Sequence, residues 1–174
     1  MTAWELKVKL MFTPIIKIIG LCLLSSGITV FGINKSAQLN MAVKKRKAVE
    51  ELLFAIENGI RYGSIEKKRI YRSFENDILN ECGFLEQLKN GKDEKECITL
   101  YLTELDKEDQ NALISFFADF GKSSSAEKEF NLCKSFIEEY KRMGTEKEKE
   151  LISKSILYKK LGLICALMSV ILLI

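Results

Sequence analysis

Two apolar segments, one at each end of the chain, constrain the fold more than any other feature. The first, "PIIKIIGLCLLSSGITVFGI" (residues 14–33), carries a single charge, Lys17, near its start. At a rise of about 1.5 Å per residue, a helix of this length spans roughly 30 Å, the hydrocarbon thickness of a bilayer. A cleaved signal peptide has a shorter apolar run and an A-x-A-like site behind it. The segment therefore predicts an uncleaved transmembrane helix.

The second segment is the tail "YKKLGLICALMSVILLI", in which two lysines are followed by fourteen uncharged residues. As a helix, residues 161–174 reach only about 21 Å, but the run reaches about 28 Å when it is counted from Ile156. This extension requires Lys159 and Lys160 to snorkel toward the membrane surface. A buried core helix is the alternative for a run of this length. We predict a second transmembrane helix over residues 156–174.

The basic residues beside these segments predict their orientation. Lys35 and the run "KKRK" follow the first helix, whereas the cations that precede it are fewer and are diluted by Glu5. The positive-inside rule then places the middle of the chain in the cytoplasm, and the lysines before the tail agree. Basic side chains near anionic lipid each contribute about 1 kcal/mol, although a solvated helix face is the simpler reading of the run. The residues expected to contact the membrane surface are Lys44, Lys45, Arg46, Lys47, Lys159 and Lys160.

The region between the segments, residues 34–155, is predicted to be helical throughout. Proline occurs once, at Pro14, and apolar residues recur at helical spacing, as in "VEELLFAIENGIRY". Asp106 is expected to cap a helix that ends at Gly121, and Ser124 with Glu127 forms a capping box. The predicted fold is all-α: a membrane-anchored bundle of about six helices between an N-terminal and a C-terminal hydrophobic helix, preceded by a tail over residues 1–13. Its expected core includes Leu53, Ile56, Phe74, Ile78, Leu113, Phe117 and Ile137.

One helix of this domain is expected to begin at the cap Ser64 and to stop near Gly83. It would bury Ile70, Tyr71, Phe74 and Ile78. After it, a turn is expected at Asn90-Gly91-Lys92.

Small residues line one face of each apolar segment, at the spacing i, i+4, i+7. Such faces let helix backbones approach closely in lipid, where apolar burial does not drive pairing. We predict that the two segments pair as an antiparallel hairpin, with hydroxyls bonding across the seam. The alternatives are packing against another subunit, or the general abundance of small residues in membrane helices. The predicted packing residues are Ser25, Thr29 and Gly32 on the first segment and Gly162, Ala166 and Ser169 on the second.

Residues that carry chemistry are scarce. The chain has no histidine, and its five cysteines include no C-x-x-C pair, so neither a metal site nor a cofactor is expected. A net charge of +3 with interleaved signs gives no basic stripe for nucleic acid. Ser64 and Lys67 match S-x-x-K, but the companion S-D-N and K-T-G motifs are missing. The chain is predicted not to be an enzyme and to have no small-molecule substrate; an enzyme using Ser64 and Lys67 is the less favoured alternative.

The order of several motifs resembles the stage III sporulation protein AB family of endospore-forming bacteria. They are the membrane helix with its basic stretch, "IENGIRYGS", "LDKEDQNALISFFADFGKSSS" and the tail "YKKLGLICALMSVILLI". In that family, too, tyrosine-glycine closes the first long helix, and a basic Y-x-x-LG opens the hydrophobic end. The family often has Thr-Pro-Leu where this chain has Ser64-Ile65-Glu66. The resemblance covers nearly the whole chain.

The resemblance implies a scaffold in the channel that connects mother cell and forespore, located in the mother-cell membrane that faces the forespore. The cytoplasmic domain of the family is similar to that of the platform protein of type II secretion and type IV pilus machines. The implied partners are a secretion-type ATPase, other membrane subunits of the channel and membrane lipid. A platform-like subunit of another secretion or pilus system is the alternative.

Overall fold

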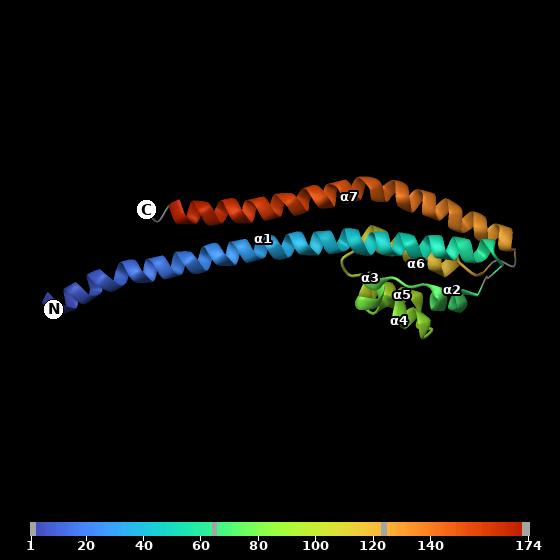
Figure 1. The fold of residues 1–174 in the computed structure, drawn as a ribbon, viewed down its shortest axis with the longest axis horizontal. Helices are drawn as coiled ribbons and strands as arrows, with labels where there is room; N and C mark the ends of the chain where they lie inside the picture. Colours follow the sequence, from blue (N-terminus) through green and yellow to red (C-terminus); the bar gives the residue numbers. More distant parts are fainter. Residues whose placement is uncertain (1–2, 64–65, 123–124, 172–174) are drawn as a thin grey trace. The chain divides into compact units, whose positions relative to one another are not determined.

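The computed structural model describes residues 3–63, 66–122 and 125–171, and the regular secondary structure of these residues is helical. The helices are α1 (Ala3–Arg61), α2 (Lys67–Ser73), α3 (Asp77–Glu81), α4 (Phe84–Lys89), α5 (Glu94–Tyr101), α6 (Lys107–Asp119) and α7 (Ala126–Ile171) (Figure 1). The all-α prediction is confirmed for the described residues. Both apolar segments are continuous with helices of the middle region, because α1 and α7 run through without a break.

The chain divides into two compact units. The hairpin unit comprises residues 1–39 and 152–174, and the helical domain comprises residues 40–151. The long helices α1 and α7 contribute to both units, whereas α2 to α6 belong to the domain. The sequence prediction had set the domain at 34–155 and a separate tail at 1–13, but α1 already begins at Ala3. The cytoplasmic location of the domain stays a prediction.

The core of the helical domain is built from the apolar faces that the sequence periodicity indicates. Leu53 and Ile56 of α1 are buried with Leu113 and Phe117 of α6 and Ile137 of α7. Two further predicted core residues, Phe74 and Ile78, are partly buried and pack against this cluster. Four aromatic rings of α6 and α7 stack at centroid distances of 4.5–5.7 Å: Phe116, Phe120, Phe136 and Tyr140.

The prediction of a single helix between Ser64 and Gly83 is wrong, because the structure has two helices there, α2 and α3. The backbone at Phe74 is extended, with φ −88° and ψ 135°, so α2 ends at Ser73. The side-chain oxygen of Asn76 then accepts a hydrogen bond from the backbone N–H of Leu79 at 3.1 Å and caps α3. In a continuous helix this N–H would donate to a backbone carbonyl of the preceding turn. Because the Asn76 side chain accepts it instead, a new helix can begin after Asn76. Ser64 lies outside the described residues.

Other boundaries follow the expected turn chemistry. The carboxylate of Asp106 accepts from the backbone N–H of Asp109 at 2.7 Å, which confirms the predicted cap of α6. Gly91 and Gly121 have φ of 81° and 84°, a left-handed conformation that glycine adopts without strain. They form the predicted turn after α4 and the predicted end of α6. The predicted capping residue Ser124 lies outside the described residues.

Candidate functional site

The hairpin unit exposes a broad apolar surface. The segment Lys17–Arg61 of α1 is long and apolar enough to cross a membrane, and it is the one such segment within the described residues. The exposed large apolar side chains of this segment that belong to the hairpin unit are Ile18, Ile19, Leu23, Leu24, Ile28, Val30, Phe31 and Ile33. An exposed patch of this size is unstable in water and indicates contact with lipid or protein. Membrane anchoring by α1 therefore accords with the prediction for residues 14–33.

The second predicted span forms the end of α7, which is helical through Ile171. Its side chains are also exposed and apolar, among them Leu161, Leu163, Ile164 and Leu167. The described part of this segment does not meet the length and hydropathy requirement that α1 meets. Residues 172–174 lie outside the described residues, so a membrane crossing over 156–174 stays a prediction.

Within the hairpin unit, α1 and α7 approach most closely at two predicted packing residues, Gly32 and Gly162. A Cβ atom added to Gly32 would lie 2.8 Å from the carbonyl oxygen of Tyr158 and 3.2 Å from the Cα of Gly162. A Cβ atom on Gly162 would lie 3.5 Å from the Cα of Gly32. Backbone stands against backbone here, so a side chain at Gly32 would force the helices apart.

The described hydroxyl groups at this seam form bonds both within α1 and between α1 and α7. Ser25 and Thr29 are half-buried, but their hydroxyls donate to carbonyls of α1 itself, at 3.1 Å to Cys22 and 2.9 Å to Ser25. The bond across the seam joins Ser36 and Ser155 instead. Their buried Oγ atoms are 2.8 Å apart. Cross-seam bonds at Ser25 and Thr29 stay a prediction, because the side chain of Ser169 lies outside the described residues.

Sequence reasoning missed Ser36 and Ser155, although Ser36 follows Gly32 at the helical spacing i+4 and so continues the predicted face. Of the remaining predicted packing residues, Ala166 is half-buried. The side chain of Ser169 lies outside the described part of the chain. That this face pairs the helices in a bilayer stays a prediction.

The predicted membrane-contacting residues fall into two groups. Lys44, Lys47, Lys159 and Lys160 are exposed and remain available for a membrane surface. Lys45 and Arg46 are only 6% and 1% exposed. Membrane-surface contact is therefore wrong for Lys45 and Arg46, because both side chains are enclosed by the helical domain.

Lys45 and Arg46 are held by partners far away in the sequence. The ammonium of Lys45 donates to the carbonyl of Tyr101 at 2.9 Å and pairs with the carboxylate of Glu104. Helix α1 buries two adjacent positions in each turn here, since residues 42, 43, 45, 46, 48 and 49 are all buried. Neighbouring helices therefore cover most of the circumference of α1. Some residues of a basic run in this part of the helix must then be buried.

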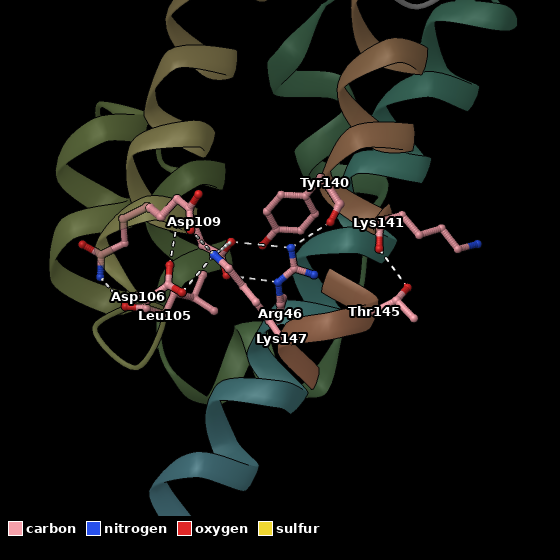
Figure 2. A network of polar contacts seen from close by, with 10 residues as sticks. Arg46, Leu105, Asp106, Asp109, Tyr140, Lys141, Thr145 and Lys147 are labelled. Carbon is pink, nitrogen blue, oxygen red and sulfur yellow. Dashed lines mark hydrogen bonds and ion pairs between the residues drawn. The ribbon is translucent and has the colours of Figure 1, made fainter. Parts of the chain in front are cut away.

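Arg46 lies at the centre of a polar network that joins α1, α6 and α7 (Figure 2). Its Nε donates to Oδ2 of Asp109 at 3.0 Å, and its Nη2 donates to the backbone carbonyl of Tyr140 at 2.8 Å. Its guanidinium carbon lies 4.1 Å from the centre of the Tyr140 ring, a cation–π distance. Asp109 is buried as well, so the pair is shielded from water.

Lys147 of α7 completes the network from the solvent side. Its ammonium lies 2.9 Å from Asp106, 2.8 Å from Glu108 and 3.1 Å from Asp109. Burial alone would lower the pKa of Lys147, but the hydrogen bonds to these three carboxylates outweigh it and raise that pKa. Burial likewise opposes ionisation of Asp106, yet the backbone N–H of Asp109 and the Lys147 ammonium hold its pKa below the usual value. Through these hydrogen bonds and ion pairs the network holds α1, α6 and α7 together.

Lys67, the lysine of the S-x-x-K motif, also has structural partners. Its ammonium donates to Glu94 at 3.1 Å and to the carbonyl of Phe117, near the end of α6, at 3.2 Å. The bond to the Phe117 carbonyl closes the C-terminal turn of α6. Ser64 lies outside the described residues, so the serine-lysine alternative stays untested. Among the described residues, no group of three or more His, Cys, Asp and Glu side chains could hold a metal ion.

Comparison with known proteins gives one match. The family model described as Stage III sporulation protein AB matches residues 17–174. Neither the curated proteins nor the solved structures contain a match. The family match covers residues 17–33 of the first apolar segment, the whole helical domain and the tail, so the chain belongs to the stage III sporulation protein AB family.

Proposed function

We propose that this protein is a membrane-anchored adaptor subunit of the channel between mother cell and forespore. In this proposal its helical domain, on the cytoplasmic side of the mother-cell membrane, links a secretion-type ATPase to membrane components. The observation that carries the proposal is the unbroken course of α1 from an exposed apolar segment into a compact domain. A continuous helix joins the apolar segment to the domain, and an adaptor requires such a covalent link between its anchor and its binding domain.

The chemistry of the domain supports binding over catalysis. The buried Arg46 and the partly buried Lys147 both pair with the buried carboxylate of Asp109, and Lys67 closes a helix end. These groups hold helices together and do not converge on a cavity. An adaptor without chemistry of its own accounts for them.

Four exposed lysines supply the proposed membrane-surface contacts: Lys44, Lys47, Lys159 and Lys160. Lys47 already pairs with Glu148 at 3.2 Å, so Lys44, Lys159 and Lys160 are the stronger candidates for lipid headgroups. Binding to vesicles that contain anionic lipid should weaken when these three are changed to glutamine, and should weaken further as salt rises.

The interaction proposal is tested by affinity purification of the tagged full chain from sporulating cells. The expected result is recovery of a secretion-type ATPase together with membrane subunits of the channel. Cells that lack the ATPase provide the control for its band. Recovery of the membrane subunits without the ATPase would contradict the proposed link to the ATPase. Recovery of neither from correctly inserted protein would contradict the adaptor proposal as a whole.

The topology proposal is tested separately by reporter fusions. A reporter after Lys47 should lie in the cytoplasm, and a reporter after Ile174 should lie on the opposite side of the membrane. If both reporters lie in the cytoplasm, the tail does not span, and the protein has one membrane arm. If the first lies outside, the cytoplasmic location of the domain is wrong.

A further inference from the structure

Gly144, in the middle of the domain part of α7, has no room for a side chain. A Cβ atom added there would lie 1.5 Å from Nη1 of Arg46 and 2.5 Å from its Cζ. Glycine is the poorest helix former apart from proline, and this one sits far from either end of α7. The guanidinium of Arg46 therefore occupies the space that any other residue at position 144 would fill.

Arg46 is not free to move out of the way. Its side chain is fully buried, its Nε and Nη2 both bond to Asp109, and Nη2 also bonds to the Tyr140 carbonyl. Its Nη1 faces Gly144 and has no hydrogen-bonding partner among the described residues. An arginine on the surface could swing aside at little cost, but this one would break its buried ion pair with Asp109 and its bond to the Tyr140 carbonyl.

The position of Gly144 matters because α7 has no other glycine within the domain. One helical turn before it stands Tyr140, and one turn after it stands Glu148. A slip of α7 along α1 by one turn, about 5.4 Å, would press one of these side chains onto the guanidinium. A buried ion pair adds little stability over apolar packing of the same volume, and its best-attested use is to fix register.

We propose that Arg46 and Gly144 form a register key, in which a large buried cation on α1 fits the position without a side chain in the domain part of α7. The key allows α7 to dock on α1 in a single axial position. Asp109 anchors the arginine from α6, so the same key also sets where α6 lies. This device goes beyond the proposed adaptor role and does not depend on which partner the protein binds.

The contact is tested by a double-mutant cycle on the full chain in detergent, read by thermal unfolding. With Arg46 in place, Gly144→Ala should lower Tm by at least about 5 °C, because the added methyl group collides with the guanidinium. In the Arg46→Met background, Gly144→Ala should raise Tm by about 2–4 °C, because alanine is the better helix former. The sign of the glycine substitution thus depends on the arginine.

If Gly144→Ala shifts Tm by the same amount in both backgrounds, whatever the sign of the shift, the proposed contact between Arg46 and Gly144 is wrong. Arg46→Lys serves as a second background, because lysine keeps the charge and lacks the planar guanidinium. If neither Arg46→Met nor Arg46→Lys folds with Gly144 present, the arginine is required for folding itself and the register key is wrong.

Register is read independently by disulfide formation between α1 and α7. In a chain with Cys22, Cys82 and Cys165 changed to serine, Lys47→Cys with Glu148→Cys reports the native register, since their side chains form an ion pair at 3.2 Å. Glu51→Cys with Glu148→Cys reports a shift of one turn. With Arg46 in place only the first pair should link. Arg46→Met should lose this selectivity, and a variant that keeps it would overturn the register role.

Discussion

Glycines sit between α1 and α7 in both units of the protein, but they serve different purposes. In the hairpin unit, Gly32 and Gly162 let two backbones meet, and the polar contact beside them joins two uncharged serines, Ser36 and Ser155. In the helical domain, Gly144 admits a charged side chain, and the polar contact is a network of buried ion pairs. The same two helices are therefore joined by two kinds of contact.

The surroundings proposed for the two units, lipid for the hairpin unit and water for the helical domain, account for this difference. In lipid, close packing at small residues is the main attraction between helices, and a charge is costly. In a water-soluble domain, apolar burial supplies the attraction, and buried charges add specificity once they are paired. The two units should therefore lose different amounts of stability when apolar bulk, charge or small residues are removed.

The largest expected effect comes from apolar bulk in the domain. Phe117 is buried in the core, so Phe117→Ala should cost about 3–5 kcal/mol of unfolding free energy. The matched variant in the hairpin unit is Phe31→Ala. Phe31 is 66% exposed, so this substitution should lower the unfolding free energy in detergent by less than about 0.5 kcal/mol. Chemical denaturation of the full chain measures both. A loss under about 1 kcal/mol for Phe117→Ala would remove it from the core.

A similar or slightly smaller effect is expected when the buried charge of the domain loses its partner. Asp109→Ala leaves the Arg46 guanidinium buried and uncompensated, which should cost about 3–5 kcal/mol. Asp119 is the control, because it also lies on α6 but pairs with Lys122 at the surface. Asp119→Ala should cost less than about 1 kcal/mol by the same denaturation measurement. Equal losses from the two substitutions would show that burial of the pair is irrelevant.

The charged network should also make the domain sensitive to acid. The folded pKa of Asp106 is depressed below its unfolded value of about 3.9, so it stabilises the fold above that pH. This contribution is lost as pH falls through the folded pKa. Thermal unfolding between pH 6 and pH 3 should show Tm falling at the acid end. The Asp106→Asn variant should fall less steeply, and an unchanged slope would mean that Asp106 is not stabilised in the folded state.

Much of this architecture is accessible from the sequence. The two apolar segments and the core residues Leu53, Leu113 and Ile137 follow from length and helical spacing, because both depend on neighbours along one helix. The cap at Asp106 follows from local chemistry for the same reason. Asn76 is also a favourable N-cap residue, but the apolar residues on both sides of it continue the helical pattern and so favour a single helix.

The burial of Lys45 and Arg46 could not be read from the sequence in the same way. Four consecutive basic residues ordinarily indicate a solvated face, and nothing nearby contradicts this. Their partners, Glu104 and Asp109, lie far along the chain and meet them only after the domain has folded. The role of Gly144 was hidden for the same reason, because the guanidinium beside it comes from another helix.

The smallest effect concerns the hydroxyl of Tyr140. It is buried and has no hydrogen-bonding partner among the described residues, while its ring stacks on Phe136 and faces Arg46. Tyr140→Phe keeps the ring and removes the unpaired oxygen, so stability should stay equal or rise by up to about 1 kcal/mol. Tyr140→Leu, which removes the ring, should be clearly destabilising under the same denaturation conditions. A loss for Tyr140→Phe as large as that for Tyr140→Leu would assign the hydroxyl a partner.

Disulfide formation across the hairpin in native membranes tests the account most directly. With Cys22, Cys82 and Cys165 changed to serine, Ser36→Cys and Ser155→Cys replace the two hydroxyls that meet at 2.8 Å. The account predicts an efficient intramolecular link, its loss when Gly32→Leu is added, and no link from the exposed Ser26→Cys to Ser155→Cys. Links only to other proteins, or none, would contradict the hairpin and separate the two arms of the anchor.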